Sequence, residues 1–360
     1  MQRPLRISAA ILTAVLTGCA AKVEGEALYD AGKCRRVTIV DAENGAAVVG
    51  AEDLAFDRVS RRILISAYDR RKVEREVKSA AFDIAQGGVY SAPIASLAGD
   101  ETTLTLASII ARDSVGGGLR PHGLSFDPGR REIAFINRSY QRIDDKWRMT
   151  ARLERADADG AVFVGEGRAP RCSANDVATL GETTLVSFDH ASCGWRGGVE
   201  DIFASRASGV ATADGERVFD GVRHANGVAA LSSGELALAA TRDREILVLT
   251  TEGEGLSVER KFPLPGAPDN LTVSSNGDIV AALHPSLLAI GMQRRLGLGR
   301  SGSRIVRVDP ETGETTLLFE DRRAKLFSAA TAAVEEEGLL AIGSVADSGL
   351  VVCKRSNEAP

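Results

Sequence analysis

Side chains of the kind that bind cations recur just before short apolar runs in this sequence. In residues 266–285 (GAPDNLTVSSNGDIVAALHP), Asp269 and Asn270 precede an apolar run, a turn and a second apolar run. A single pair of this kind usually marks only a turn, because these side chains compete with backbone pairing. Here, however, corresponding positions along the chain carry related residues: Glu52-Asp53, His122, Asn175-Asp176, Asn226, Asp269-Asn270 and, in the last copy, the small residues Ser328-Ala329-Ala330.

The chemistry of this set is that of a hard-cation site. Carboxylate and amide oxygens without thiolates favour Ca²⁺ over Zn²⁺. Glu52 and Asp269 would balance the two positive charges of one ion. The alternative is six unrelated turn signals, which would show no preference for acidic and amide residues at corresponding positions. The recurrence therefore predicts a calcium site where these positions meet.

The segments that carry these residues are repeats. Each has two small or polar residues, an alternating apolar run, a turn rich in Gly, Asp, Ser or Glu, and a second apolar run, which is typical of a β-hairpin. The spacings are 70, 53, 51, 43 and 60 residues between Glu52, His122, Asn175, Asn226, Asp269 and Ala329. No helical period interrupts the series. We therefore predict an all-β fold over residues 34–353, a six-bladed β-propeller with four-stranded blades.

A propeller would bring the polar positions together. The innermost strand of each blade points at the central axis, so the residues that begin it project into the top of the tunnel. Six strand starts would then converge on one place. The repeats and the polar residues thus predict the same feature, a metal-binding tunnel.

The first residues are predicted to direct export. Arg3 and Arg6 precede an apolar stretch that is much shorter than the roughly 20 residues of a membrane span, so residues 1–18 are expected to be a signal peptide. The sequence Leu-Thr-Gly-Cys at 16–19 resembles a bacterial lipobox, which would place a lipid on Cys19. Ala20 fits outer-membrane sorting. We expect a tether at 19–33, a tail at 354–360 and a lipid-anchored protein of the bacterial cell envelope.

Composition and cysteine usage agree with this location. A net charge of −5 and a pI near 5.6 give no basic surface for nucleic acid, and 44% hydrophobic residues exclude a disordered chain. We expect a monomer. Apart from Cys19, four cysteines allow three disulfide pairings. Cys34 and Cys353 could join the two ends of the fold and Cys172 and Cys193 could pair locally, although the second two could also stay unpaired and buried.

The ordered set of motifs resembles the serum paraoxonase and arylesterase family. The motifs are AEDLAFD, RPHGLSF, NDV, HANGV, PDNLTV, ALHP and the terminal LLAIGSVADSGLVVC, and together they extend over about residues 34–353. The resemblance implies a six-bladed propeller with two Ca²⁺ ions that hydrolyses lactones and aryl esters, and in some members organophosphates. It also implies a bridge between Cys34 and Cys353.

The resemblance assigns roles to individual residues. The catalytic Ca²⁺ would be held by Glu52, Asn175, Asn226, Asp269 and Asn270. The structural Ca²⁺ would be held by Asp53, Asp176 and the backbone carbonyl of Leu124. Neighbouring residues can serve different ions, because successive side chains at a strand start point in opposing directions.

Histidines complete the expected site. The upper Ca²⁺ would polarise the ester carbonyl, and His122 would act as base toward water, although it could also only shape the pocket. His284 would line the pocket and His190 would pack beneath it. Where the family has a second histidine this sequence has Arg138, which cannot relay a proton at neutral pH. Apolar residues 286–292 could border the mouth and favour a lactone with an apolar tail, or form a packed loop or short helix.

Two other functions fit parts of the pattern. A related group that resembles gluconolactonases binds one metal with a similar Glu and Asn/Asp set and acts on sugar lactones. Alternatively, the chain could be a non-catalytic propeller that is tethered at the membrane as a binding module. The second-position residues Asp53 and Asp176 and the terminal cysteines favour the two-metal family, and a small-molecule lactone or ester as the partner.

Overall fold

The computed structural model describes residues 23, 25–158, 160 and 170–355. The predicted signal peptide (1–18), Cys19, Ala20, part of the tether and most of the tail lie outside these residues. In the described ranges, no helix is long and apolar enough to cross a membrane.

The six predicted repeats each form an antiparallel hairpin. Alternating apolar residues face the neighbouring sheets on both sides of these strands, while the Gly- and Asp-rich segments between them form the turns. The hairpins are β2 (Val49–Asp57) with β3 (Arg62–Ala67), β6 (Pro121–Asp127) with β7 (Glu132–Ile143), β9 (Ala174–Leu180) with β10 (Thr183–Phe188), β13 (Ala225–Ala230) with β14 (Leu236–Ala240), β17 (Ala267–Val273) with β18 (Ile279–His284), and β21 (Ala330–Glu336) with β22 (Leu339–Ser348).

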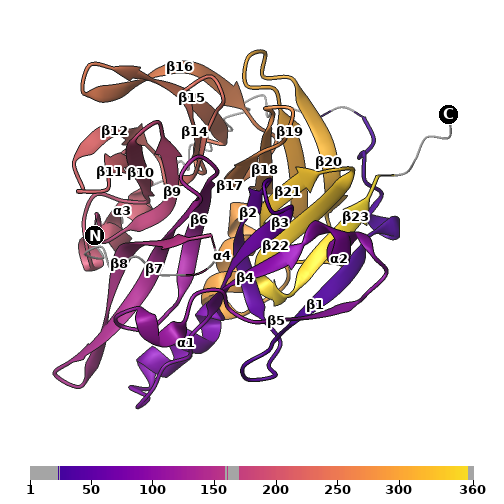
Figure 1. Ribbon diagram of the computed structural model, residues 1–360. Coiled ribbons are helices and arrows are strands. Elements are labelled where there is room, and N and C mark those ends of the chain that lie inside the picture. Colours follow the sequence, from indigo (N-terminus) through magenta and orange to yellow (C-terminus); the bar gives the residue numbers. More distant parts are fainter. Residues whose placement is uncertain (1–22, 24, 159, 161–169, 356–360) are drawn as a thin grey trace, which may run out of the picture.

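Further strands extend these hairpins into sheets (Figure 1). Three sheets have four strands each: β9–β12, β13–β16 and β17–β20, with outer strands β11 (Ser208–Thr212), β12 (Arg217–Val222), β15 (Glu245–Glu252), β16 (Gly255–Pro263), β19 (Ser303–Val308) and β20 (Thr315–Asp321). Strand β8 (Lys146–Asp157) joins β6 and β7. A larger sheet has the order β4-β3-β2-β22-β23-β1-β5, with β21 paired to β22; its remaining strands are β1 (Arg35–Asp41), β4 (Gly88–Pro93), β5 (Thr103–Leu106) and β23 (Leu350–Lys354).

The two ends of the chain meet in this larger sheet. Strand β1 pairs antiparallel with β23, so the first strand completes the sheet that the last hairpin begins. A disulfide between Cys34 and Cys353 fixes the same junction, and a second one joins Cys172 to Cys193. Both expected pairings are confirmed.

The first strands of the six hairpins lie next to one another in a closed order. Strand β2 contacts β6, β6 contacts β9, β9 contacts β13, β13 contacts β17, β17 contacts β21, and β21 contacts β2. The apolar core is divided between the facing sheets: one cluster joins sheet β9–β12 to sheet β13–β16, and another joins sheet β13–β16 to sheet β17–β20. The beginnings of the first strands are thereby gathered at one end.

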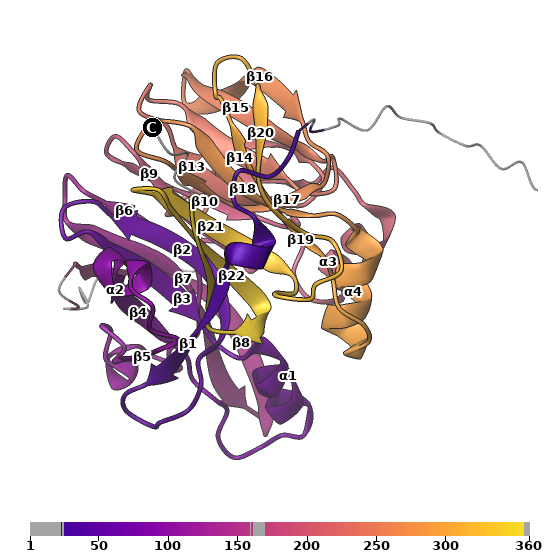
Figure 2. The same cartoon turned by 90° about the vertical axis from the view of Figure 1, so that its right-hand side faces the viewer.

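Three helices lie at that same end. In an antiparallel hairpin the second strand finishes beside the start of the first, as the pairs Ala51 with Ala67, Ala174 with Phe188 and Ala267 with His284 demonstrate. The helices α1 (Arg70–Lys78), α3 (Trp195–Phe203) and α4 (Leu287–Leu296) follow these second strands. Figure 2 shows them on one side of the molecule, away from α2 (Ile94–Ala98).

The helices correct the expectation that no helical segment interrupts the repeats. They are short and lack a broad apolar face: α1 buries only Val73. Helices this short are stabilised mainly by tertiary contacts and capping, so a sequence pattern alone does not establish them. Asp69 and Ser286 cap α1 and α4 by accepting from backbone N–H groups in the first turn.

We expect the disulfide between Cys34 and Cys353 to stabilise the fold more than the one between Cys172 and Cys193. The loop-closure entropy removed from the unfolded chain grows with loop length, and the sequence separations are 319 and 21 residues. Replacing both cysteines of the first pair by serine should cost about 2 kcal/mol more than the same change in the second pair. Urea unfolding monitored by circular dichroism measures both costs, and equal costs would contradict the expectation.

Candidate functional site

Every predicted ligand with a polar side chain, and the predicted base His122, is buried at the start of a first strand. These residues, called here the strand-start cluster, are 1% to 6% exposed: Glu52, Asp53, His122, Asn175, Asp176, Asn226, Asp269 and Asn270. Burying polar groups costs free energy unless each finds a partner. The partners that the structure provides therefore indicate what the cluster can do.

The three asparagines use only half of their hydrogen-bonding capacity. The amide nitrogens donate to Asp189 Oδ1 from Asn175 (2.9 Å), to Asp269 Oδ1 from Asn226, and to the Glu52 carbonyl from Asn270 (2.9 Å). All three amide oxygens are buried and have no hydrogen-bond partner. An unsatisfied buried acceptor costs about 1–3 kcal/mol, so three together need an explanation.

A bound cation satisfies such oxygens. Because the amide nitrogens are already engaged, the asparagines present oxygen, the donor atom that Ca²⁺ takes from amides. Among the described residues, no group of three or more His, Cys, Asp and Glu side chains is placed to hold a metal. The donor set is thus a mixture of amides and carboxylates, and it fits a hard cation.

Asp53 and Asp176, the second polar residues of two strand starts, bind the neighbouring hairpins. Asp53 Oδ2 accepts from the backbone N–H of Leu124 at 2.7 Å, and Asp176 Oδ2 accepts from that of Val228 at 2.7 Å. Glycine precedes each of these amides. A Cβ on Gly123 would lie 2.3 Å from the Cα of Asp176, and one on Gly227 would lie 2.6 Å from the Cα of Asn270. The glycines of the HGL and NGV motifs are therefore required by close packing between strands.

The two aspartates also affect each other. Burial raises the pKa of Asp53 well above its usual value, and the charges of Asp176 and Glu52 raise it further. Burial raises the pKa of Asp176 to about 8, despite hydrogen bonds from Val228 and Val177 that oppose the shift. Two buried carboxyl groups that are difficult to ionise together are stabilised by a cation between them.

Glu52 and His122 form a second pair, with Arg70 of α1 beside them. His122 Nδ1 lies 2.6 Å from Glu52 Oε2. Arg70 Nη2 lies 3.0 Å from Nδ1 and 3.2 Å from Nε2 of the same ring, and 3.8 Å from Glu52 Oε1. Because the ring nitrogens face different directions, these similar distances place the guanidinium against the face of the imidazole.

Charge and burial keep this histidine neutral. Burial lowers the pKa of His122 to about 4, with further lowering by Arg138 and Arg70, although Glu52 opposes the shift. Burial alone would raise the pKa of Glu52, but His122, Arg70 and Arg138 hold it well below its usual range. Near neutral pH, His122 is therefore neutral and lies beside an ionised Glu52.

The remaining predicted residues lie around this cluster. His284 Nε2 lies 2.7 Å from Asp269 Oδ2, so this histidine is hydrogen-bonded to a predicted ligand. His190 packs against α3, where a Cβ on Gly197 would lie 2.7 Å from its ring. The side chain of Asn137, which precedes Arg138, is fully engaged with backbone atoms of Arg120 and Gly118.

Sequence reasoning missed Asp189 and Arg70. Each stands just after the second strand of a hairpin, and so beside the polar start of the first strand. That position is the signal that could have identified them. A polar residue that ends a hairpin is a candidate for the site whenever the same hairpin begins with one.

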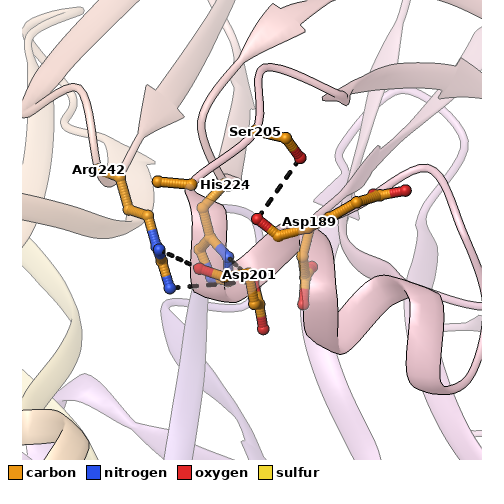
Figure 3. A pocket seen from close by; sticks show the side chains of 7 residues that line it. Asp189, Asp201, Ser205, His224 and Arg242 are labelled. Carbon is orange, nitrogen blue, oxygen red and sulfur yellow. Dashed lines mark hydrogen bonds and ion pairs between the residues drawn. The ribbon is translucent and has the colours of Figure 1, made fainter.

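A small pocket lies next to the cluster (Figure 3). It is lined by Asp189, Glu200, Asp201, Ala204, Ser205, His224 and Arg242. Burial disfavours the protonated His224, but Asp201 and Asp189 hold its pKa above the usual value. The pocket encloses about 10 Å³, the space of one water molecule. It supports Asp189 and is too small for an organic substrate.

Comparisons with known proteins identify the class of fold. The sequence matches no protein-family model and no curated protein sequence. Among solved structures, a gluconolactonase from Xanthomonas campestris aligns with a TM-score of 0.52 at 15% identity, over 93% of this chain and 99% of that chain. At this identity the likeness shows the fold alone.

Two further structures align less well. A candidate gluconolactonase has a TM-score of 0.49 at 14% identity, over 91% of this chain and 94% of that chain. A luciferin-regenerating enzyme has a TM-score of 0.49 at 11% identity, over 86% of this chain and 93% of that chain. Neither score is high enough to add to the argument.

The aspartate pair predicts an unusual pH dependence for the calcium-free protein. The pKa of Asp176 is raised from 3.8 to about 8, so the folded chain binds a proton that the unfolded chain releases. Stability is then highest below the unfolded pKa and falls as the pH rises toward 8. Thermal unfolding in EGTA should show this decline, and Asp176→Asn should weaken it. A melting temperature that rises over the same pH range would contradict the expectation.

Proposed function

We propose that this chain is a calcium-dependent carboxylic-ester hydrolase, a lactonase with aryl-esterase side activity. The observation that carries the proposal is the set of three buried amide oxygens without partners, next to the carboxylates Glu52 and Asp269. Their chemistry is that of a Ca²⁺ site at the end of the molecule where three helices gather. The resemblance of the ordered motifs to the paraoxonase and arylesterase family supports the choice of reaction.

The fold behind this proposal is a six-bladed β-propeller with a central tunnel. It is supported by the closed order of contacts among the six first strands and by three complete four-stranded sheets. Strand β1 would supply the outermost strand of the last blade, closing the ring together with the bridge between Cys34 and Cys353. We also propose a lipid on Cys19 and a location in the bacterial cell envelope.

Two Ca²⁺ ions would be held in this arrangement. The catalytic ion would be bound by Glu52, Asn175, Asn226, Asp269 and Asn270, and the structural ion by Asp53, Asp176 and the carbonyl of Leu124. When bound, the catalytic ion would polarise the ester carbonyl and stabilise negative charge on its oxygen. The hydrogen bonds from Asn226 and His284 fix both oxygens of Asp269 for this role.

His122 would assist by accepting the proton of the attacking water at Nε2. Glu52 Oε2 lies 2.6 Å from Nδ1 of the ring, and Arg70 against the ring face disfavours the protonated form. With a pKa of about 4, His122 is a weak base at neutral pH. Its contribution to the rate is therefore smaller than that of the electrostatic stabilisation.

A second candidate is a gluconolactonase-like enzyme that binds one metal and acts on sugar lactones. The shared fold with the Xanthomonas campestris gluconolactonase favours it. The two proposals differ in the number of ions, because Asp53 and Asp176 have a ligand role only in the first. Native mass spectrometry of the calcium-loaded protein would distinguish one bound ion from two.

We expect the calcium-loaded protein to hydrolyse lactones faster than phenyl acetate. The motif resemblance and the oxygen-rich site both point to an electrophilic carbonyl as the target. A pH-stat assay over lactones of graded tail length, with and without EGTA, measures the activity. Absence of hydrolysis of every lactone by the calcium-loaded protein would reject the proposal.

The two ions also predict different effects of neighbouring mutations. Glu52→Gln removes one of the charges at the catalytic ion and the negative charge beside His122, so turnover should fall by at least about a hundredfold in a folded protein. Asp53→Asn should instead lower the melting temperature, because Asp53 joins β2 to β6. Calorimetry and kinetics on both variants test this, and identical behaviour would refute the assignment of the two ions.

A further inference from the structure

Asp189 orients one of the three asparagines of the strand-start cluster. Asn226 and Asn270 donate their amide N–H groups to other members of the cluster. Asn175 donates instead to Oδ1 of Asp189 at 2.9 Å, and Asp189 lies outside the cluster. An amide group that turns over exchanges its oxygen and its nitrogen. The acceptor on Asp189 therefore leaves the oxygen of Asn175, which has no hydrogen-bond partner, free for a cation.

Hydrogen bonds and a disulfide hold Asp189 at the start of strand β9. The backbone N–H of Asp189 donates to the carbonyl of Ser173 at 3.1 Å, and the hydroxyl of Ser173 donates to the carbonyl of His190 at 2.5 Å. Cys172 is the residue before Ser173, and its disulfide partner is Cys193. The chain that leaves Asp189 is therefore tied back to the strand that begins with the cluster.

Burial of apolar side chains does little to hold the segment that follows Asp189. Helix α3, to which this segment leads, buries only Gly197. The large side chains of Trp195, Ile202 and Phe203 are 76%, 73% and 78% exposed. Hydrophobic stabilisation is proportional to the apolar area that is removed from water, and these side chains contribute little of it. A segment with few buried apolar contacts opens locally unless other bonds hold it.

Glu200 of α3 provides further bonds to this segment. Its Oε2 accepts from the backbone N–H of Ala191 at 2.8 Å and from that of Ser192 at 3.4 Å. These bonds join the segment to α3 rather than to β9. The disulfide between Cys172 and Cys193, together with Ser173, connects the segment to β9 itself. A covalent link of this kind removes many of the conformations that an opened segment could adopt.

We infer that the disulfide between Cys172 and Cys193 is a clamp that holds Asp189 beside Asn175, and thereby keeps the amide oxygen of Asn175 available to the catalytic ion. The inference rests on the proposed function and adds to it a positioning residue, Asp189, and a role for the shorter disulfide. The disulfide at the ends of the fold stabilises the whole chain, whereas this one acts on the affinity of the site for calcium.

Calcium binding by two Asp189 variants tests the positioning role. Asp189→Ala removes the acceptor for Asn175, so isothermal titration of the full protein with calcium chloride should give a Kd for the catalytic ion at least about tenfold weaker than that of the parent. Asp189→Asn keeps an oxygen that can accept the same hydrogen bond and should recover most of this loss. Equal weakening by both variants would show that Asp189 acts through its charge, and would overturn the inference.

The two disulfides provide a matched pair of variants for the clamp. C172S/C193S should also weaken the Kd of the catalytic ion at least about tenfold. The control C34S/C353S should lower the melting temperature more and leave this Kd unchanged. If serine at positions 172 and 193 prevents folding, C172A/C193A gives the same comparison. A Kd that is unchanged in C172S/C193S, or equally weakened in the control, would overturn the inference while leaving the hydrolase function intact.

Hydrogen exchange gives a readout that depends on neither calcium nor turnover. In EGTA, the backbone N–H of Asp189, which donates to Ser173, should exchange at least about tenfold faster in C172S/C193S than in the parent. Mass spectrometry of peptides that cover residues 187–194 measures this rate. If the parent binds no calcium, the proposed function fails, and the exchange rate still decides whether the disulfide holds Asp189. Equal rates in both proteins would refute the clamp.

Discussion

The structure depends on the burial of polar side chains at the starts of six neighbouring strands. Four carboxylates, three amides and a histidine are removed from water within this small region. Transferring such groups from water is strongly unfavourable unless they are paired or neutralised. The contacts of the surrounding fold offset part of the free-energy cost of this burial.

Hydrogen bonds across strands provide part of the compensation. Asp53 and Asp176 each accept from the backbone of the next hairpin, and Asn270 donates to the backbone of β2. The same contacts hold neighbouring sheets in register, so the polar residues contribute to the architecture as well as to the site. Gly123 and Gly227 have no room for a side chain, because the neighbouring strand approaches closely there. These bonds leave the side-chain oxygens of the three asparagines without a partner, and those oxygens support the calcium proposal.

The helices at this end provide the rest of the electrostatic environment. Helix α1 places Arg70 against His122, and Arg71 of the same helix donates to the carbonyl of Gln293 in α4. The guanidinium of Arg70 therefore lies beside a cluster that contains four carboxyl groups. Helix α4 also exposes the apolar side chains of Leu288 and Met292.

The sequence alone determined the repeats, the hairpins and the identity of the polar strand starts. Period-two alternation and turn residues are local signals, and the recurrence of Glu, Asp and Asn at corresponding positions is visible without a structure. Cys34 and Cys353 marked the two ends of the fold. The pairing of β1 with β23 joins residues more than 300 positions apart, and Cys34 and Cys353 are separated by 319. Only the folded chain displays this contact.

Only the tertiary structure decided the arrangement around the cluster. Helices α1, α3 and α4 have only nine or ten residues each, and helices this short depend for their stability on where they dock. Arg70 and Asp189 are ordinary polar residues in the sequence, and their role follows from the strand starts that they contact. The free amide oxygens of Asn175, Asn226 and Asn270 follow from hydrogen bonds to residues distant in sequence, which no local signal can specify.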